Sequence, residues 1–168
     1  MTTTITDIRC AEEIDAACLD RVHSASWHHT YTGIIPFRSL NAMIARRNSA
    51  WWARTINAGA RVLVCRFGGS IVGYATLGRN RTEALPVEGE IYELYLEPNF
   101  QGVGLGRRLF AAARDRLTLD GAKGCAVWTL AENERAMMFY HSLGGADVAQ
   151  GAEIFGGKTV GKVAFLWT

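Results

Sequence analysis

Residues 94–108 read LYLEPNFQGVGLGRR, an apolar strand candidate that runs into a glycine-rich turn and then directly into a helix candidate. The first turn of a helix has unpaired N–H groups and the positive end of the helix dipole. Glycines at alternate positions, 102, 104 and 106, let the backbone approach an anion closely. Arg107 and Arg108 add positive charge. This stretch therefore predicts an anion site, for which a diphosphate is the natural ligand.

Three interpretations of the glycine-rich turn compete. A Walker A loop requires G-x-x-x-x-G-K-[ST]; residues 157–159 (GKT) supply its end, but Ala152 stands where the first glycine belongs, so we interpret this triplet as a hairpin turn. A Rossmann loop requires G-x-G-x-x-G, whereas residues 102–106 have the spacing G-x-G-x-G. The simplest interpretation is a tight turn between a strand and a helix.

The sequence predicts that residues 1–168 form a single domain of interleaved strands and helices. Strand candidates span residues 3–9, 61–67, 70–77, 88–96, 124–130, 146–155 and 159–167, and helix candidates span 11–30, 38–57, 105–117 and 133–143. The first helix candidate carries apolar groups at helical spacing, at Ile14, Ala17, Cys18, Val22 and Ala25. Gly68 and Gly69 suit a two-residue type I′ hairpin turn. The order β-α-α-β-β-β-α-β-α-β-β predicts a mixed sheet with helices on its faces.

The composition narrows the function classes. The chain is 49% hydrophobic and 20% charged, with a net charge of +2, which is too small for a non-specific nucleic-acid binder. No window of 18 uncharged apolar residues predicts a membrane span, and residues 1–7 lack the pattern of a signal peptide. The cysteines at 10, 18, 65 and 125 form no C-x-x-C pair, which favours free thiols in a reducing cytoplasm.

Two motifs resemble those of the GNAT superfamily of acetyl-CoA-dependent N-acetyltransferases. Residues 101–106 (QGVGLG) match its signature Q/R-x-x-G-x-G/A, and residues 94–98 (LYLEP) are similar to the L-x-V-x-P strand end before it. Residues 133–144 (NERAMMFYHSLG) resemble the second motif, N-x-x-A-x-x-F-Y-x-x-x-G. The resemblance implies an α+β fold, with a mostly antiparallel sheet of six to seven strands and about four helices. Gly145 departs from the family, which usually has an apolar phenylalanine there.

The resemblance also implies how acetyl-CoA binds. The pantetheine arm pairs with the backbone of Leu94, Tyr95 and Leu96, in a gap that separates this strand from residues 124–130. Backbone N–H groups hold the pyrophosphate, from Gln101, Gly102, Val103, Gly104, Leu105, Gly106 and Arg107. Asn133 hydrogen-bonds the pantetheine, and Phe139 belongs to the same cofactor-binding set. The residue types alone also allow Asn133 to be a helix N-cap.

The implied reaction is direct transfer of the acetyl group to a primary amine. A protonated amine must lose a proton before it attacks, and an acid must protonate the departing thiolate. Tyr140 is the implied acid; a half-buried core aromatic is the structural alternative. We predict Glu93, or a water molecule that it orients, as the base, with Glu90 and Tyr92 as competitors. Glu90 and Glu93 share a face of the strand only if a bulge lies between them.

The remaining candidates concern the acceptor. We interpret His28 and His29 as structural or acceptor-site residues and predict no metal site, because no third ligand is suitably spaced. Trp27 and Tyr31 are minor candidates for contact with the acceptor, whereas Trp51, Trp52 and Met43 suit a helix core. The acceptor is a small-molecule or peptide amine, with no nucleic-acid or membrane partner, and a homodimer is possible through an edge strand. The alternatives are a different acyl-CoA donor or a non-catalytic CoA-binding regulatory module.

Overall fold

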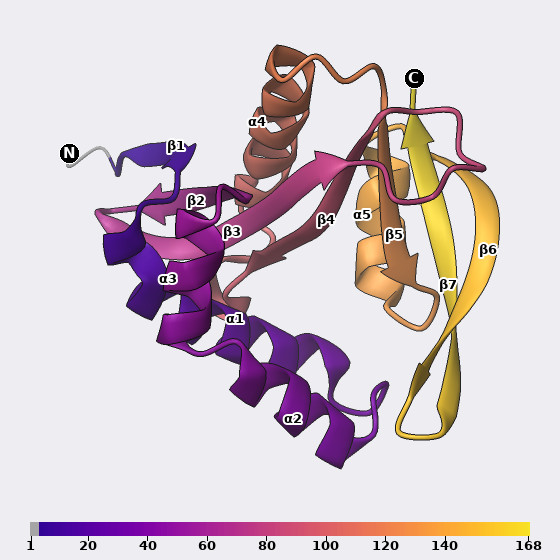
Figure 1. Cartoon of the computed structure of the whole chain (residues 1–168), viewed down its shortest axis with the longest axis horizontal. Coiled ribbons are helices and arrows are strands. Elements are labelled where there is room, and N and C mark those ends of the chain that lie inside the picture. Colours follow the sequence, from indigo (N-terminus) through magenta and orange to yellow (C-terminus); the bar gives the residue numbers. More distant parts are fainter. Residues whose placement is uncertain (1–3) are drawn as a thin grey trace.

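The computed structural model describes residues 4–168, so Thr3, the first residue of the predicted N-terminal strand, lies outside the described residues. One mixed sheet has the strand order β1-β2-β3-β4-β5-β7-β6 (Figure 1). Its strands are β1 (Thr6–Cys10), β2 (Arg61–Phe67), β3 (Ser70–Arg79), β4 (Gly89–Leu96), β5 (Cys125–Leu130), β6 (Ala146–Phe155) and β7 (Lys158–Trp167). The β4–β5 pair is parallel and the other pairs are antiparallel. This arrangement confirms the predicted fold class.

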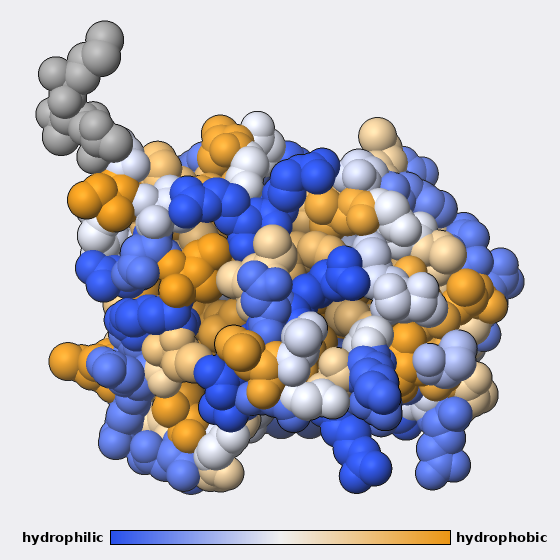
Figure 2. Space-filling view, turned by 90° about the horizontal axis from the view of Figure 1, so that it is seen from above, coloured by the Kyte–Doolittle hydropathy of each residue, from blue (hydrophilic) through white to orange (hydrophobic). Residues whose placement is uncertain are grey.

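Helices cover both faces of the sheet. They are α1 (Ala16–Tyr31), α2 (Phe37–Arg46), α3 (Ser49–Asn57), α4 (Leu105–Leu119) and α5 (Glu134–Ser142), with short 3-10 turns at Glu13–Asp15 and Pro98–Phe100. The helices α4 and α5 pack with the largest apolar cluster on one face, and α1, α2 and α3 cover the other face (Figure 1). No helix within residues 4–168 is long and apolar enough to cross a membrane. Seen from above, hydrophilic and hydrophobic residues alternate over the surface (Figure 2), as is usual for a surface in water.

Two details of the helical predictions are wrong. The predicted helix 38–57 is two helices, because Arg47 leaves helical geometry and the Asn48 side chain accepts a hydrogen bond from the Trp51 N–H, which starts α3. The predicted buried face of α1 is also displaced: Ile14 is 83% exposed, whereas His23 and Ser26 are fully buried. Hydrophobic spacing misses such a face because two of its buried residues are polar.

The hairpin turns follow the sequence. Gly68 and Gly69 both have positive φ, 60° and 85°, as a type I′ turn requires. Gly156 and Gly157 repeat this pattern between β6 and β7, so residues 157–159 belong to a hairpin. At Gly145, a Cβ atom would lie 2.6 Å from the Trp167 ring, so this indole fills the space that a larger side chain would need.

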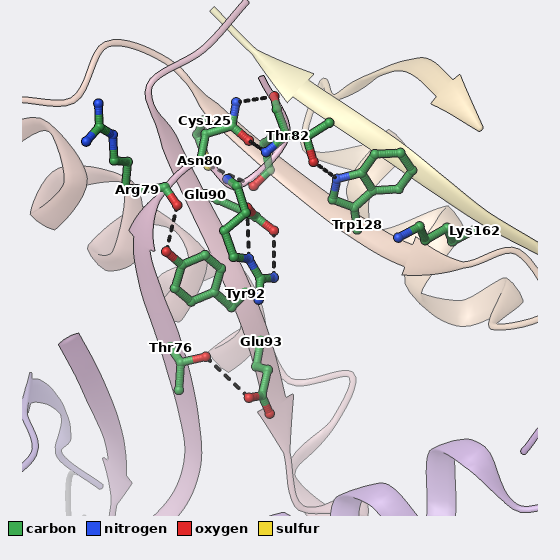
Figure 3. Close-up of polar contacts among 12 residues, drawn as sticks. Thr76, Arg79, Asn80, Thr82, Glu90, Tyr92, Glu93, Cys125, Trp128 and Lys162 are labelled. Carbon is green, nitrogen blue, oxygen red and sulfur yellow. Dashed lines mark hydrogen bonds and ion pairs between the residues drawn. The ribbon is translucent and has the colours of Figure 1, made fainter. Parts of the chain in front are cut away.

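A bulge in β4 changes which side chains share a face. Thr76 of β3 pairs with Glu93, but the next residue, Leu77, pairs with Ile91, which leaves Tyr92 as the extra residue. Ile91 and Leu94 consequently both face the α4 side. Glu90 and Glu93 therefore project together from the opposite face (Figure 3).

Candidate active site

A gap opens between the two parallel strands at the centre of the sheet. The strands β4 and β5 pair at Gly89 with Cys125 and at Glu90 with Ala126, and then diverge (Figure 1). A cavity of about 490 Å³ lies against the end of β4, the start of α4 and α5. At this end, one edge of β4 is paired with β3 and the other edge faces the gap without a neighbouring strand. This geometry accommodates an extended ligand that pairs with the strand edge.

Most of the residues predicted to bind cofactor, together with Tyr140, line this cavity. They are Leu94, Tyr95, Leu96, Gln101, Gly102, Gly104, Gly106, Arg107, Asn133, Phe139 and Tyr140. Val103 and Leu105 do not line it: the Val103 side chain is 64% exposed and Leu105 is in the core. Their predicted role is a backbone role, which does not require the side chain to face the cavity.

The glycine-rich turn leads into the N-terminus of α4. Gly102 and Gly104 have φ of 76° and 88°, which side-chain-bearing residues rarely adopt, and Gly104 is the N-cap residue of the helix. At Gly106 a Cβ atom would lie 3.3 Å from the Phe139 ring. The turn thus exposes helix N–H groups beside the cavity, where the helix dipole favours an anion.

Two basic side chains border the same cavity. Arg107 was predicted, but Arg135 of α5 was not, although it lies within the second motif. Its guanidinium lies 3.8 Å from the position that a Cβ on Gly102 would take. The spacing of charge within a helix does not reveal this proximity, because it depends on how α5 packs beside the turn.

Gln101 connects the turn to the end of β4. Its Nε2 group donates a hydrogen bond to the Leu96 carbonyl oxygen over 3.1 Å. Its Oε1 atom is buried and accepts no hydrogen bond from residues 4–168. A buried acceptor beside a cavity suits a ligand that brings an N–H group. This unpaired oxygen fits the amide-containing pantetheine arm.

The residues of the second motif occupy α5. The Asn133 side chain accepts a hydrogen bond from the Ala136 N–H over 3.2 Å, so its oxygen caps the helix while the residue also borders the cavity. Tyr140 is 5% exposed, and its ring packs against Phe110 and Phe165 at centroid distances of 6.2 and 5.7 Å. Burial raises the pKa of the Tyr140 hydroxyl well above its usual value, so this group is protonated at neutral pH.

Glu93 lies behind the cavity wall. Its carboxylate forms an ion pair with Arg47 and accepts a hydrogen bond from the Tyr74 hydroxyl over 2.8 Å. It accepts a longer hydrogen bond from Thr76 over 3.5 Å (Figure 3). The side chain is 12% exposed and does not line the cavity. Tyr95, two residues further along β4, does line the cavity and forms this part of its wall. The partners Arg47 and Tyr74 have no sequence signal that connects them with Glu93.

The two competitors of Glu93 are engaged elsewhere. Glu90 is 1% exposed and accepts hydrogen bonds from the backbone and the guanidinium of Arg81, at 3.0 and 2.9 Å. The Tyr92 hydroxyl donates to the Arg79 carbonyl oxygen over 2.6 Å (Figure 3). Neither residue lines the cavity.

The acceptor candidates of α1 are divided between core and cavity. Trp27 is 7% exposed, and the Tyr31 hydroxyl is hydrogen-bonded to that of Tyr95. Burial raises the pKa of Tyr31 to about 12, although the hydrogen bond from Tyr95 opposes this shift. His28 and His29 are exposed, and His29 borders the cavity. Within residues 4–168, no group of three or more potential ligands is arranged for a metal ion.

Trp51, Trp52 and Met43 follow the core prediction. Trp52 is fully buried, and Trp51 and Met43 are partly buried against apolar clusters. The four cysteines are free; Cys65 and Cys125 are buried. Apart from the exposed Cys10, these side chains belong to the interior of the protein, and none of them lines the cavity.

Comparisons with known proteins identify similar chains. The model of the acetyltransferase (GNAT) family matches residues 25–144. The uncharacterized N-acetyltransferase YuaI of Bacillus subtilis is 30% identical over 162 residues, which are 95% of this chain and 91% of that protein. The L-methionine sulfoximine/L-methionine sulfone acetyltransferase of Salmonella typhimurium is 28% identical over 147 residues, covering 85% of this chain and 81% of that one. The structure of yncA, a putative acetyltransferase from Salmonella typhimurium with its cofactor acetyl-CoA, has a TM-score of 0.70 at 24% identity and covers 96% of this chain and 92% of its own.

Proposed function

The chain belongs to the GNAT family of N-acetyltransferases, and from this premise we propose that it transfers an acetyl group from acetyl-CoA to the primary amine of a small acceptor. The observation that carries the proposal is the cavity beside the end of β4, where this strand has diverged from β5, with the glycine-rich start of α4 at one end. One edge of this cavity is unpaired strand and another is a helix N-terminus. The two surfaces match the two parts of acetyl-CoA, an amide-containing arm and a diphosphate.

The chain's own residues would hold acetyl-CoA in this cavity. The backbone of Leu94, Tyr95 and Leu96 pairs with the pantetheine arm, and Gln101 Oε1 accepts one of its N–H groups. The N–H groups from Gln101 to Arg107 bind the pyrophosphate, with the guanidinium of Arg135 nearby as a further cation. Asn133 and Phe139 form the wall on the α5 side.

Glu93 and Tyr140 are the two side chains that transfer protons during the reaction. Acetyl-CoA supplies a thioester whose acyl carbon is open to attack by an amine. Glu93, or water that it orients, accepts a proton from the acceptor ammonium group. Tyr140 keeps its proton because its pKa is raised by burial, and it donates that proton to the sulfur that leaves. The buried phenolate is unfavourable, so Tyr140 regains a proton before the next turnover.

The identity of the acceptor is narrowed by the relatives. The Salmonella typhimurium relative acts on methionine sulfoximine and methionine sulfone, and an Escherichia coli relative is named an L-amino acid N-acyltransferase. They support a small amine such as an amino acid. The scattered free cysteines support a reducing cytoplasm as the site of the reaction. The exposed edge strand β6 is the surface for a possible homodimer, which sedimentation velocity would test.

The substitution Tyr140→Phe tests the proposed function. It removes the acid and keeps the ring, so kcat should fall about 10²- to 10⁴-fold, while the Kd for CoA should change less than about threefold. The measurements are thiol release across a panel of amines and calorimetry with CoA. Tyr92→Phe is the matched control, because the Tyr92 hydroxyl is bound to a carbonyl group outside the cavity.

The outcomes separate the alternatives. Unchanged turnover in Tyr140→Phe would remove this residue from the acid role. Tight CoA binding without acetylation of any amine would favour a regulatory module. Faster turnover with a longer acyl-CoA would favour a different donor.

A further inference from the structure

A partly buried ion pair lies behind the part of the cavity wall that Tyr95 of β4 forms. Arg47, at the end of α2, pairs with Glu93 of β4, and the two side chains are 25% and 12% exposed. The Arg47 guanidinium lies over the Trp27 and Trp51 rings, 5.2 and 4.8 Å from their centroids. Two aromatic rings thus hold the positive charge in place from the side. Removing both charges from bulk water costs free energy, so this ion pair contributes little net stability to the contact between α2 and the sheet.

The two members of the pair are fixed independently. Glu93 keeps hydrogen bonds from Tyr74 and Thr76 when Arg47 is disregarded. A guanidinium carries five N–H donors, and within residues 4–168 the Arg47 side chain hydrogen-bonds to Glu93 alone. Arg47 therefore has donors to spare for an anionic ligand, and Glu93 remains positioned if the two separate.

The surrounding structure favours a short acceptor. The linker between α1 and α2 and the start of α2 touch the β6–β7 hairpin: Lys158 Nζ donates to the Ile34 carbonyl oxygen over 2.8 Å, and a Cβ on Gly156 would meet the Ser39 hydroxyl. Ile35 and Val160 belong to one buried apolar cluster. Figure 1 shows the segment between α1 and α2 next to the tip of the β6–β7 hairpin. A polypeptide that lay across β4 and β5 on this face would meet the contact, whereas a single small molecule would not.

Building on the proposed function, we infer that the acceptor is a free α-amino acid, bound by inserting its zwitterion between Arg47 and Glu93. The α-carboxylate takes the guanidinium, and the α-ammonium takes the Glu93 carboxylate. An acceptor with only an ammonium group would leave Arg47 unpaired between two indole rings and add a positive charge beside it. A zwitterion satisfies both side chains and leaves the net charge of the site unchanged.

The binding mode also provides the proton path. Glu93 accepts one proton from the α-ammonium, and the amine lone pair forms the N–C bond while the C–S bond breaks. The sulfur receives a proton from Tyr140, the second proton that leaves the nitrogen reprotonates Tyr140 by way of solvent, and Glu93 releases its proton to solvent. Ammonium and thioester thus become amide, thiol and one proton released to solvent, with no oxidant or reductant. The same carboxylate that binds the acceptor makes it nucleophilic.

The first experiment compares acceptors in the wild-type enzyme. Each of the common L-amino acids is assayed with acetyl-CoA, and the best one is compared with its α-amide and with the dipeptide that it begins. We expect the free amino acid to exceed both analogues in kcat/KM at least about tenfold, the minimum for loss of a charge-assisted hydrogen bond. Calorimetry of the same compounds on the CoA-bound enzyme should give the same order without turnover.

The second experiment replaces Arg47, the side chain that binds the α-carboxylate of the acceptor. Arg47→Gln should reduce the preference for the free acid over the amide to less than about threefold, and Arg47→Lys should retain part of it. Arg54→Gln is the matched control, because Arg54 is an exposed arginine of α3, the neighbouring helix. The wild-type comparison stands even if Arg47→Gln fails to fold.

The results distinguish two kinds of failure. If the amide or the dipeptide matches the free amino acid, the inference is wrong while the acetyltransferase function stands. An unchanged preference in a folded Arg47→Gln protein would also overturn it. If CoA does not bind and no amine is acetylated, the proposed function itself fails.

Discussion

The buried imidazole of His23 makes stability depend on pH in a way that can be calculated. His23 is fully buried in α1, 4.6 Å from the Trp27 ring between centroids, and neither ring nitrogen has a hydrogen-bond partner among residues 4–168. Burial, together with the nearby positive charge of Arg47, lowers its pKa from 6.5 to about 3. The folded protein therefore carries this imidazole in its neutral form.

The direction in which pH changes the free energy of unfolding depends on whether the folded or the unfolded chain binds the proton. As pH falls below 6.5, the unfolded chain takes up a proton at His23 and the folded chain does not until about pH 3. The unfolded state is thereby favoured by about 1.4 kcal/mol for each pH unit. Between about pH 7.5 and pH 5.5 the free energy of unfolding should fall by about 1.4 kcal/mol from this group. Any folded pKa well below 5.5 gives the same result.

The substitution His23→Leu removes the effect. It should also remove the cost of the unpaired ring nitrogens, about 1–3 kcal/mol, against some loss of packing. Urea unfolding at the two pH values measures the difference between variant and wild type. That difference should grow by about 1.4 kcal/mol at the lower pH, whereas the exposed control His28→Leu should change stability by less than about 0.5 kcal/mol at either pH. A difference that stays the same at both pH values would refute the reasoning.

Four further predictions concern the cavity and the packing around it. Gly104→Glu should abolish CoA binding, because φ of 88° is strained for a side chain and the new charge opposes a diphosphate; calorimetry with CoA measures it. Glu93→Gln should lower kcat about 10²- to 10⁴-fold with CoA affinity retained, and a kcat near wild type would contradict the base role. Gly145→Ala should cost about 1–3 kcal/mol because its Cβ would meet the Trp167 ring at 2.6 Å; an unchanged melting temperature would show that the ring can move. Acetyl-CoA at about a hundred times its Kd should raise the melting temperature by about 5–10 °C.

The sequence was most informative where function depends on the backbone. The glycine-rich turn, the strand before it and the helix after it are local features of the sequence. The presence of glycine by itself indicates a backbone that can adopt positive φ. The hairpin glycines at 68–69 and 156–157 are local in the same way. Helix α1 shows where this reasoning stops: its buried face includes His23 and Ser26, and hydrophobic spacing assigns such residues to solvent.

The hairpins, the start of α4 and the element order, apart from the division of residues 38–57 into α2 and α3, follow from the sequence itself, because turns, caps and periodicity depend on residues a few positions apart. The partners of Glu93 were decided by the tertiary structure alone. Arg47 lies 46 residues before Glu93 in the sequence, just after α2, and Tyr74 lies in the adjacent strand. One bulged residue, Tyr92, turns Glu93 to the face where these partners lie. A side chain's charge environment is set by what packs against it, and that packing exists only once the sheet and its helices have assembled.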